Sequence, residues 1–220
     1  MGGAEKATEP AASDALANIL RAAEVEFADK GFEGAGMKAL ALRAGVSQSL
    51  LHYHFGSKDN LYAAVIRERS RLINEDRLVR LRAIDPAGPG ALARIFEALF
   101  VPALGPLGGG RAYARIFAGL IAGNARDQAL VKEFYDPTAR EFLRAIGAAL
   151  PGVTAADAAR IYQFALGVLA SVIARDGRTE RLAGAGDAVI DDVGLVEALT
   201  AFAVGGAEAI AGKTKNPRED

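Results

Sequence analysis

The chain contains no cysteine and only two histidines among its 220 residues. The lack of cysteine excludes disulfide bonds, thiolate metal sites and cysteine nucleophiles. It allows a reducing compartment without requiring one. The two histidines, His52 and His54, lie two positions apart. The rest of the chain therefore cannot supply a catalytic triad or a histidine-based metal centre, and general acid–base catalysis lacks partners there.

The chain also lacks an excess of charge of either sign. Its 26 Lys and Arg residues and 27 Asp and Glu residues leave a net charge of −1, and the pI is about 6.2. Overall basicity therefore does not indicate nucleic-acid binding, and any such surface must be local. Hydrophobic residues make up 51% and charged residues 24%, as in ordinary globular chains.

No segment has the length and composition of a signal peptide or a membrane span. The N-terminal stretch MGGAEKATEPAASD has no apolar core, so we expect no secretory signal. The longest apolar run covers 161–174 and lies between Arg160 and Arg175. It is too short to cross a bilayer and is typical of a buried core helix. We expect a soluble, cytoplasmic protein with no membrane partner.

Alternation of β-branched residues is absent, and Ala, Leu and Arg dominate, so an all-α fold is expected. Glycines and capping residues predict helices over about 14–30, 37–44, 48–54 and 58–82, of which the first three form a helix-turn-helix domain. Beyond a Pro- and Gly-rich break at 85–90, helices are predicted near 91–104, 111–125, 128–149, 155–175 and 192–211. A kink or a fresh start with Asp136 as cap is left open at Asp136-Pro137, and 175–191 is predicted to be a loop. The expected domains are 13–58 and 59–212, between disordered ends at 1–12 and 213–220.

The third helix divides into two faces within a window, 34–58, that contains no acidic residue. Leu51 and Phe55 are four apart and share a face, so they can hold the helix against the core. The outward face then presents side chains that donate, accept or stack without negative charge: Gln48, Ser49, His52 and Tyr53. A helix of this size fits the major groove, where Gln can bond to adenine. Leu50 can contact a thymine methyl group there.

Cationic residues near this helix are candidates for phosphate contacts. Lys58 and the amides that begin the fourth helix suit an anion. His54 is placed to do the same, although a packed, neutral histidine is an alternative. Lys38 is a further candidate, and Arg43 is either another or a solvated charge. A metal pair is not expected, since His52 and His54 point to different faces of a helix and no carboxylate is near.

Two glycine-containing stretches imitate nucleotide-binding loops. The segment from Gly206 to Thr214 has one residue too many between its glycines, follows no predicted strand and leads into no helix. The loop GPLGGG at 105–110 follows no strand either. No cofactor is expected.

Residues 16–66 resemble the DNA-binding region of the TetR family of bacterial transcription regulators. The stretches "ILRAAEVEFADKGFEG" and "ALRAGVSQSLLHYHFGSKDNLY", and their spacing, carry the resemblance. The remaining helical pattern is compatible with the family's ligand-binding and dimerisation domain. Two positions depart from the family pattern, which often has Thr or Ser where Gly36 stands and Tyr where His52 stands.

The resemblance implies a homodimer whose third helices read two half-sites of an operator in double-stranded DNA. The residues it places at or near DNA are Lys38, Gln48, Ser49, Leu50, His52, Tyr53, His54 and Lys58. It also implies a cavity in the second domain for a small, partly apolar effector. The candidate wall residues, each of which taken singly is typical of core, are Phe96, Phe100, Phe117, Phe134 and Tyr162, and the candidate polar anchors are Tyr113, Arg115, Asn124 and Gln163.

The last two predicted helices carry an apolar surface that favours dimerisation. The residues concerned are Val168, Leu169, Val172 and Ile173 on one helix and Leu195, Leu199, Phe202 and Val204 on the other. In the family, two such helices from each subunit form a four-helix bundle. The expectation is a ligand-responsive DNA-binding repressor that is not an enzyme, with activation left open. The alternative is an all-helical small-molecule-binding protein or enzyme in which the helix-turn-helix is only structural.

Overall fold

The computed structural model describes residues 12–121, 123–173, 177–184 and 191–215. Within these ranges every regular element is a helix, so the all-α prediction is confirmed. Most of the two ends predicted to be disordered, 1–12 and 213–220, lies outside the described residues, and the helices reach Ala12 at one end and Lys215 at the other. The chain divides into two compact units, 1–66 and 67–220.

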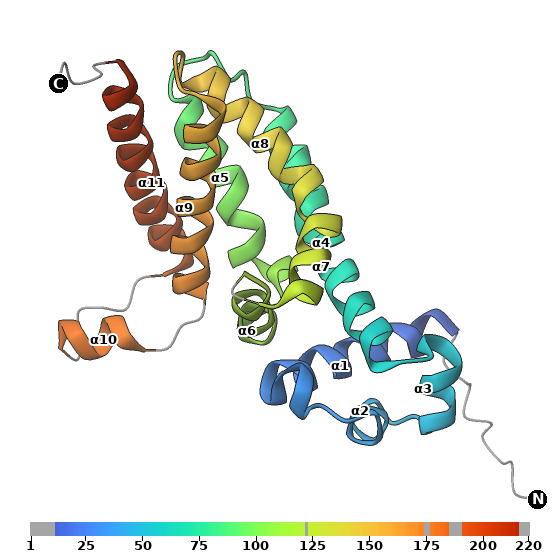
Figure 1. The fold of residues 1–220 in the computed structure, drawn as a ribbon. Coiled ribbons are helices and arrows are strands. Elements are labelled where there is room, and N and C mark those ends of the chain that lie inside the picture. Colours follow the sequence, from blue (N-terminus) through green and yellow to red (C-terminus); the bar gives the residue numbers. More distant parts are fainter. Residues whose placement is uncertain (1–11, 122, 174–176, 185–190, 216–220) are drawn as a thin grey trace, which may run out of the picture. The chain divides into compact units, whose positions relative to one another are not determined.

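The first unit contains α1 (Ala12–Gly34), α2 (Met37–Ala44), α3 (Gln48–Phe55) and the start of α4 (Lys58–Arg82) (Figure 1). Its core is formed by side chains that helical spacing places on inward faces: Ile19, Phe27, Leu40, Leu51, Leu61 and Val65, each at most 2% exposed. Burial of one such side chain contributes roughly 1.5–3 kcal/mol. The rings of Phe27, Phe32 and Tyr62 meet with centroids 5.0–6.1 Å apart and close one end of this core.

Two glycines turn the chain in this unit. Gly31, at φ 68° and ψ 173°, breaks the helical path inside α1, so the predicted stop at this residue becomes a kink. Gly45, at φ 67° and ψ 28°, ends α2 in the left-handed conformation. Its neighbour Val46 donates its backbone N–H to the carbonyl of Ala41 at 3.0 Å. This is the bond expected of a glycine-terminated helix, and it sets the turn between α2 and α3.

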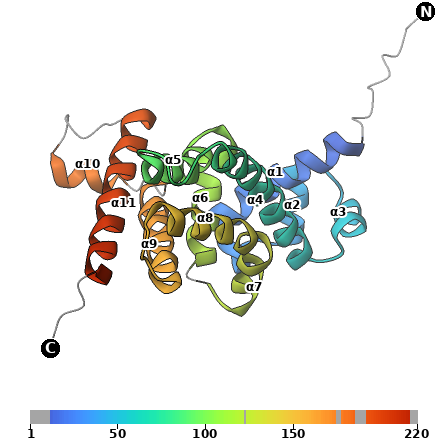
Figure 2. The same cartoon turned by 90° about the horizontal axis from the view of Figure 1, so that it is seen from above.

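The second unit contains the rest of α4 and the remaining helices. These are α5 (Ala91–Leu104), the 3₁₀ helix η1 (Pro106–Gly108), α6 (Gly110–Ile121), α7 (Ala125–Phe134), α8 (Asp136–Ala149), α9 (Ala155–Ile173), α10 (Arg178–Ala183) and α11 (Asp192–Lys215). Its core includes Ile95, Phe96, Leu99, Phe142 and Leu169. α11 packs along α5 and α9, as both views show (Figures 1 and 2).

Two predictions for the second unit needed correction. The single helix expected over 128–149 is two helices, α7 and α8, which meet at Tyr135. Pro137 lies in the first turn of α8, where a missing N–H costs nothing, so this is the fresh start and not the kink. Tyr135, and not Asp136, precedes that helix. The loop expected over 175–191 contains α10, six residues that follow Gly177 in the left-handed conformation. Its polar composition was taken as a loop, although Arg, Glu and Leu are good helix formers.

The two compact units divide at Ile66, which lies inside α4. The predicted domain boundary fell at 58/59, where α4 begins. One continuous helix supplies Leu61 and Val65 to the first core and Leu81 to the second. A boundary based on helix starts could not find a division inside a helix.

Candidate DNA-binding surface and buried pocket

Side-chain and backbone bonds at both ends fix the position of α3. The Ser47 hydroxyl accepts the backbone N–H of Leu50 at 3.1 Å and so caps the start of the helix, as its sequence predicted. At the other end the Asn60 amide donates to the Phe55 carbonyl at 2.9 Å, and the backbone N–H of Asn60 donates to the Ser57 hydroxyl at 3.2 Å. These bonds join the end of α3 to the first turn of α4.

The outward face of α3 is the one the sequence predicted. Leu51 is fully buried and Phe55 half-buried, so both face the core. All six predicted DNA contacts on this helix are exposed: Gln48, Ser49, Leu50, His52, Tyr53 and His54. Tyr53 is 83% exposed, an unusual position for a large aromatic side chain without a partner. Exposure of His54 argues against the packed alternative, and its ring lies 5.3 Å from that of Tyr53.

His52 is held in one orientation by its own backbone surroundings. Its Nδ1 lies 3.0 Å from the carbonyl oxygen of Gly56. A carbonyl can only accept, so Nδ1 carries the proton in this contact. In the neutral ring Nε2 is then an acceptor on the outward face of the helix. It can accept from the exocyclic amino group of adenine or cytosine in a major groove.

Lys58 is the predicted cation with the most contacts. Its Nζ donates to the Phe32 carbonyl at 2.8 Å, lies 3.4 Å from the Glu33 carbonyl, and sits 4.4 Å from the centroid of the Phe32 ring. These contacts fasten the start of α4 to the end of α1. An ammonium has three N–H donors, so a phosphate contact by Lys58 stays a prediction that must share the group with these carbonyls. Lys38 is exposed on the first turn of α2.

Arg43 is neither a solvated charge nor a free phosphate ligand. Its Nε donates to the Glu26 carboxylate at 2.8 Å, and a second nitrogen lies 3.4 Å from Asp29. The Glu26 side chain is only 5% exposed, whereas that of Arg43 is 38% exposed. Glu26 lies on α1, outside the acid-free window, so a reading of the window alone could not identify it as the partner.

In the second unit, some of the predicted effector residues belong to the solid core. Phe96 and Phe100 are fully buried, and their rings stack 6.0 Å apart. Tyr162 is buried with its ring 6.1 Å from that of Phe142. None of these three lines a described hollow, so their effector role stays a prediction, as does that of the other candidates.

The remaining predicted anchors lie apart from one another. Asn124 is exposed and caps α7, where its side-chain oxygen accepts the N–H groups of Arg126 and Asp127 at 3.1 and 3.3 Å. Arg115 is exposed on α6. Phe134 is half-buried beneath the Arg67 guanidinium, which lies 5.3 Å from the ring centroid.

Two predicted residues, Tyr113 and Phe117, meet at a buried hollow. Its walls also include Ile73, Arg77, Ala103, Gly108, Tyr135 and Ile173, and its free volume is about 10 Å³, enough for about one water molecule. The Tyr113 and Tyr135 hydroxyls hydrogen-bond to each other. A second hollow of about 90 Å³ shares Phe117 and Tyr135 and has exposed Gln128 and Gln163 on its rim. A third of about 200 Å³ shares Ala103 and Ile173.

Arg77 is the polar residue of this site that the sequence analysis missed. It is 2% exposed, and its Nε donates to the Leu99 carbonyl at 3.0 Å. Burial lowers the pKa of the Arg77 guanidinium, and the charged groups that act on it are the tyrosines at 162, 135 and 113. Burial also raises the pKa of Tyr135 to about 12. No sequence signal separates Arg77 from the other arginines of α4, since the helix reads as polar and solvated.

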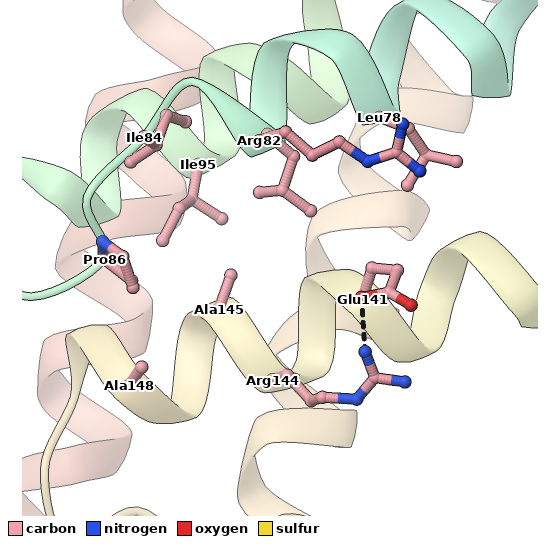
Figure 3. Close-up of a pocket in the computed structure, with 10 residues that line it drawn as sticks. Leu78, Arg82, Ile84, Pro86, Ile95, Glu141, Arg144, Ala145 and Ala148 are labelled. Carbon is pink, nitrogen blue, oxygen red and sulfur yellow. Dashed lines mark hydrogen bonds and ion pairs between the residues drawn. The ribbon is translucent and has the colours of Figure 1, made fainter.

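A separate groove lies on the surface between the end of α4 and α8 (Figure 3). It holds about 340 Å³ and has an apolar floor that includes Leu81, Ile95 and Ala145. Arg144 pairs with Glu141 on one wall, and Arg82 is exposed on the other. No residue predicted for the effector lines this groove.

The two last long helices leave apolar side chains uncovered within one chain. Phe164 on α9 and Phe202 on α11 are 59% and 67% exposed. Leu169 and Leu199, which were expected at a dimer surface, are instead buried in the chain's own core. By length and composition alone α9 and the stretch Asp192–Gly212 could cross a membrane. Core helices of soluble proteins pass the same test, and both helices contribute to the core.

Comparison with known proteins gives matches to both parts of the chain. The family described as bacterial regulatory proteins, tetR family, matches residues 19–65, and the tetracyclin repressor-like C-terminal domain matches residues 95–206. The transcriptional activator FasR of Mycolicibacterium smegmatis is 49% identical over 49 residues, and the transcriptional repressor AcnR of Corynebacterium glutamicum is 36% identical over 67 residues. These matches span 22% and 29% of this chain, and 22% and 36% of the two relatives.

A solved structure resembles nearly the whole chain. The TetR-like transcriptional regulator of Rhodococcus sp. RHA1 superposes with a TM-score of 0.59 over 96% of this chain and all of that one. The two sequences are 22% identical, so this likeness concerns the fold.

Proposed function

Because the chain belongs to the TetR family of DNA-binding transcription regulators, we propose that it is a homodimeric repressor that a small effector releases from its operator. The observation that carries the proposal is the outward face of α3. Six side chains are exposed there on a helix that presents no acidic group. Such a face suits the major groove of a polyanion.

The proposed roles differ along the helix. Gln48, Ser49 and His52 read base edges by hydrogen bonds, while Leu50 and Tyr53 contact methyl groups, sugars or bases. His52 contributes an acceptor, since its other nitrogen is bonded to the Gly56 carbonyl. The cationic contacts to phosphates come from Lys38, His54 and Lys58, and they position the helix without reading sequence. These positions are listed in order of their distance from the core: Gln48, Ser49, Leu50, Tyr53, His54, His52, Lys58, Lys38.

Dimerisation is proposed through α9 and α11. Their exposed apolar side chains, Phe164, Phe202 and Val193 among them, support an interface between copies of the chain. Gly205 and Gly206 are exposed with open space beside them, so a partner helix can approach closely. A symmetric dimer can present its two α3 helices to successive major grooves about 34–36 Å apart.

The effector acts by choosing between conformations. A ligand that binds better to a dimer with the wrong separation of the two reading helices weakens DNA binding by its differential affinity, and by no more. FasR is named an activator and AcnR a repressor, although both resemble this chain in the DNA-binding region. That region therefore does not set the sign of regulation, and repression is proposed because loss of spacing is the simplest consequence of effector binding.

Mobility-shift titration with DNA fragments from the gene's own neighbourhood tests the proposal. Gln48→Ala should change which fragments bind most tightly. Lys58→Met, which keeps the packing on Phe32, should weaken binding to all fragments alike. It should also lower the slope of log affinity against log salt by about one unit. Lys132→Met, an exposed lysine on α7, is the matched control and should leave the slope unchanged.

The alternative is an all-helical small-molecule-binding protein or enzyme with a structural helix-turn-helix. It predicts that no fragment shifts at low salt and that a screen for turnover or ligand binding alone is positive. A sequence-specific shift that Gln48→Ala alters would eliminate this alternative.

A further inference from the structure

Arg77 is a buried cation that has no acidic partner among the described residues. Its two hydrogen bonds go to neutral oxygens, the Leu99 carbonyl at 3.0 Å and the Asn74 side chain at a long 3.5 Å. The Asn74 amide is itself held by the Phe134 carbonyl at 2.9 Å. A guanidinium has five N–H donors, so this surrounding satisfies only part of the group.

Such an arrangement costs stability. A buried charge is normally paired, because loss of water is not repaid by neutral acceptors alone. Apolar residues in place of buried charged groups often leave a fold equally stable or more stable. The cost is explained if a partner that carries the opposite charge arrives from outside the chain.

The surroundings of Arg77 define that partner. The hollow beside it is lined by the hydroxyl-bearing Tyr113 and Tyr135 and otherwise by apolar side chains. The hydroxyls can donate to an anion once their mutual bond opens. The two adjoining hollows extend the apolar walls, and one of them reaches the surface at Gln128 and Gln163. A ligand with one compact anionic head and an apolar body matches this sequence of walls.

We propose that the effector is a carboxylate whose head group binds Arg77 and the hydroxyls of Tyr113 and Tyr135, with its apolar body between Phe117 and the adjoining hollows. This inference rests on the proposed function, in which the second unit binds an effector. An arginine and a carboxylate form paired, charge-assisted hydrogen bonds, which are stronger than neutral ones. The free volume of about 10 Å³ beside Arg77 requires the shared walls, Tyr135 and Phe117, to move when the ligand enters.

The surface groove in Figure 3 is the competing location, and its charges are of a different kind. Arg144 already pairs with Glu141, and Arg82 is exposed to water. Neither gains what a buried guanidinium gains from an incoming carboxylate, since water already solvates it. Arg82 therefore provides the matched control on the same helix.

Direct binding of acid and alcohol pairs to the full-length protein tests the proposal. The probes are straight-chain carboxylates from butanoate to decanoate, each beside the alcohol of equal length, and benzoate beside benzyl alcohol. Calorimetry gives affinities, and thermal melting gives the stability of the free protein. We expect the best acid to bind roughly 10–100-fold more tightly than its alcohol. The near-ultraviolet signal of the tyrosines should change as Tyr135 moves.

Arg77→Met should abolish the preference for the acid while the free protein melts at the same temperature or higher. Arg82→Met should retain the preference. If Arg77→Met does not fold, Arg77→Lys keeps the charge but lacks the planar fork and should reduce the preference about tenfold. The proposal is overturned if no acid is preferred over its alcohol, if the preference survives at position 77, or if Arg82→Met removes it.

The same measurements separate this site from the proposed function. Arg77-dependent binding of an acid without any change in operator affinity would leave the site standing and remove its regulatory role. Release of the operator by an uncharged compound, unaffected by Arg77→Met, would overturn the carboxylate proposal and leave the proposed function intact.

Discussion

Removal of Arg43 should loosen the DNA-binding unit far more than its exposed position suggests. The Glu26 carboxylate is almost buried and accepts its 2.8 Å bond from Arg43. Arg43→Ala leaves that charge without its partner in a poorly solvated place. A hydrogen bond to a charged group is worth about 1.5–3 kcal/mol, and a fully buried pair costs about 3–5 kcal/mol to break. Because Arg43 is itself partly exposed, we expect a loss of about 2–3 kcal/mol.

Hydrogen exchange measured by mass spectrometry can localise this loss to α1 and α2. A loss of 2–3 kcal/mol corresponds to roughly 30–150-fold faster exchange of amides that open only with the whole unit. Arg21→Ala, which removes an exposed arginine from α1, is the control and should change exchange by less than about threefold. Glu26→Met combined with Arg43→Ala removes the stranded charge and should restore part of the protection. An acceleration below about threefold in Arg43→Ala, or no recovery in the double variant, would refute this reasoning.

Two further predictions concern a turn and a buried phenol. Gly45→Ala should destabilise the first unit by about 1–2 kcal/mol in urea unfolding, because its φ of 67° is left-handed while its Cβ would meet open space. Gly36→Ala, at φ −106° with the same open space, is the control, and equal losses would show that conformation is not the cause. Burial raises the pKa of Tyr135 to about 12 from 10.0. The folded state therefore keeps a proton that the unfolded state releases, so this contribution is complete below pH 10 and is lost between pH 10 and 12, by about 1.4 kcal/mol per pH unit. Absorbance at 295 nm should show a late phenol that Tyr135→Phe removes, and an unaltered titration above pH 11 in that variant would contradict the assignment.

The reading face was predictable because local chemistry determines it. Ser47, Gly45 and Gly56 mark the ends of α2 and α3, and the spacing of Leu51 and Phe55 orients α3. No long-range contact is needed to decide which side of an eight-residue helix faces the core. The partner of Arg43 required a contact across 17 positions and was missed.

The buried pocket was less predictable for the same physical reason. Tyr113 and Phe117 were identified from their types, but aromatic residues of the solid core, such as Phe96, have the same types. Arg77 lies in a helix rich in exposed arginines, and only the packing of α5 and α6 against that helix makes its environment different. Burial of a charge is a property of the tertiary structure that helical periodicity does not record.

The attachment of α3 by its end caps has an evolutionary consequence. Only Leu51 and Phe55 tie its length to the core, while the bonds of Ser47 and Asn60 hold its two ends. Exchange of Gln48, Ser49 or Tyr53 therefore costs the scaffold almost nothing. A duplicated gene could drift toward new target sites while its product keeps folding, and a library randomised at these positions should consist mostly of well-folded members.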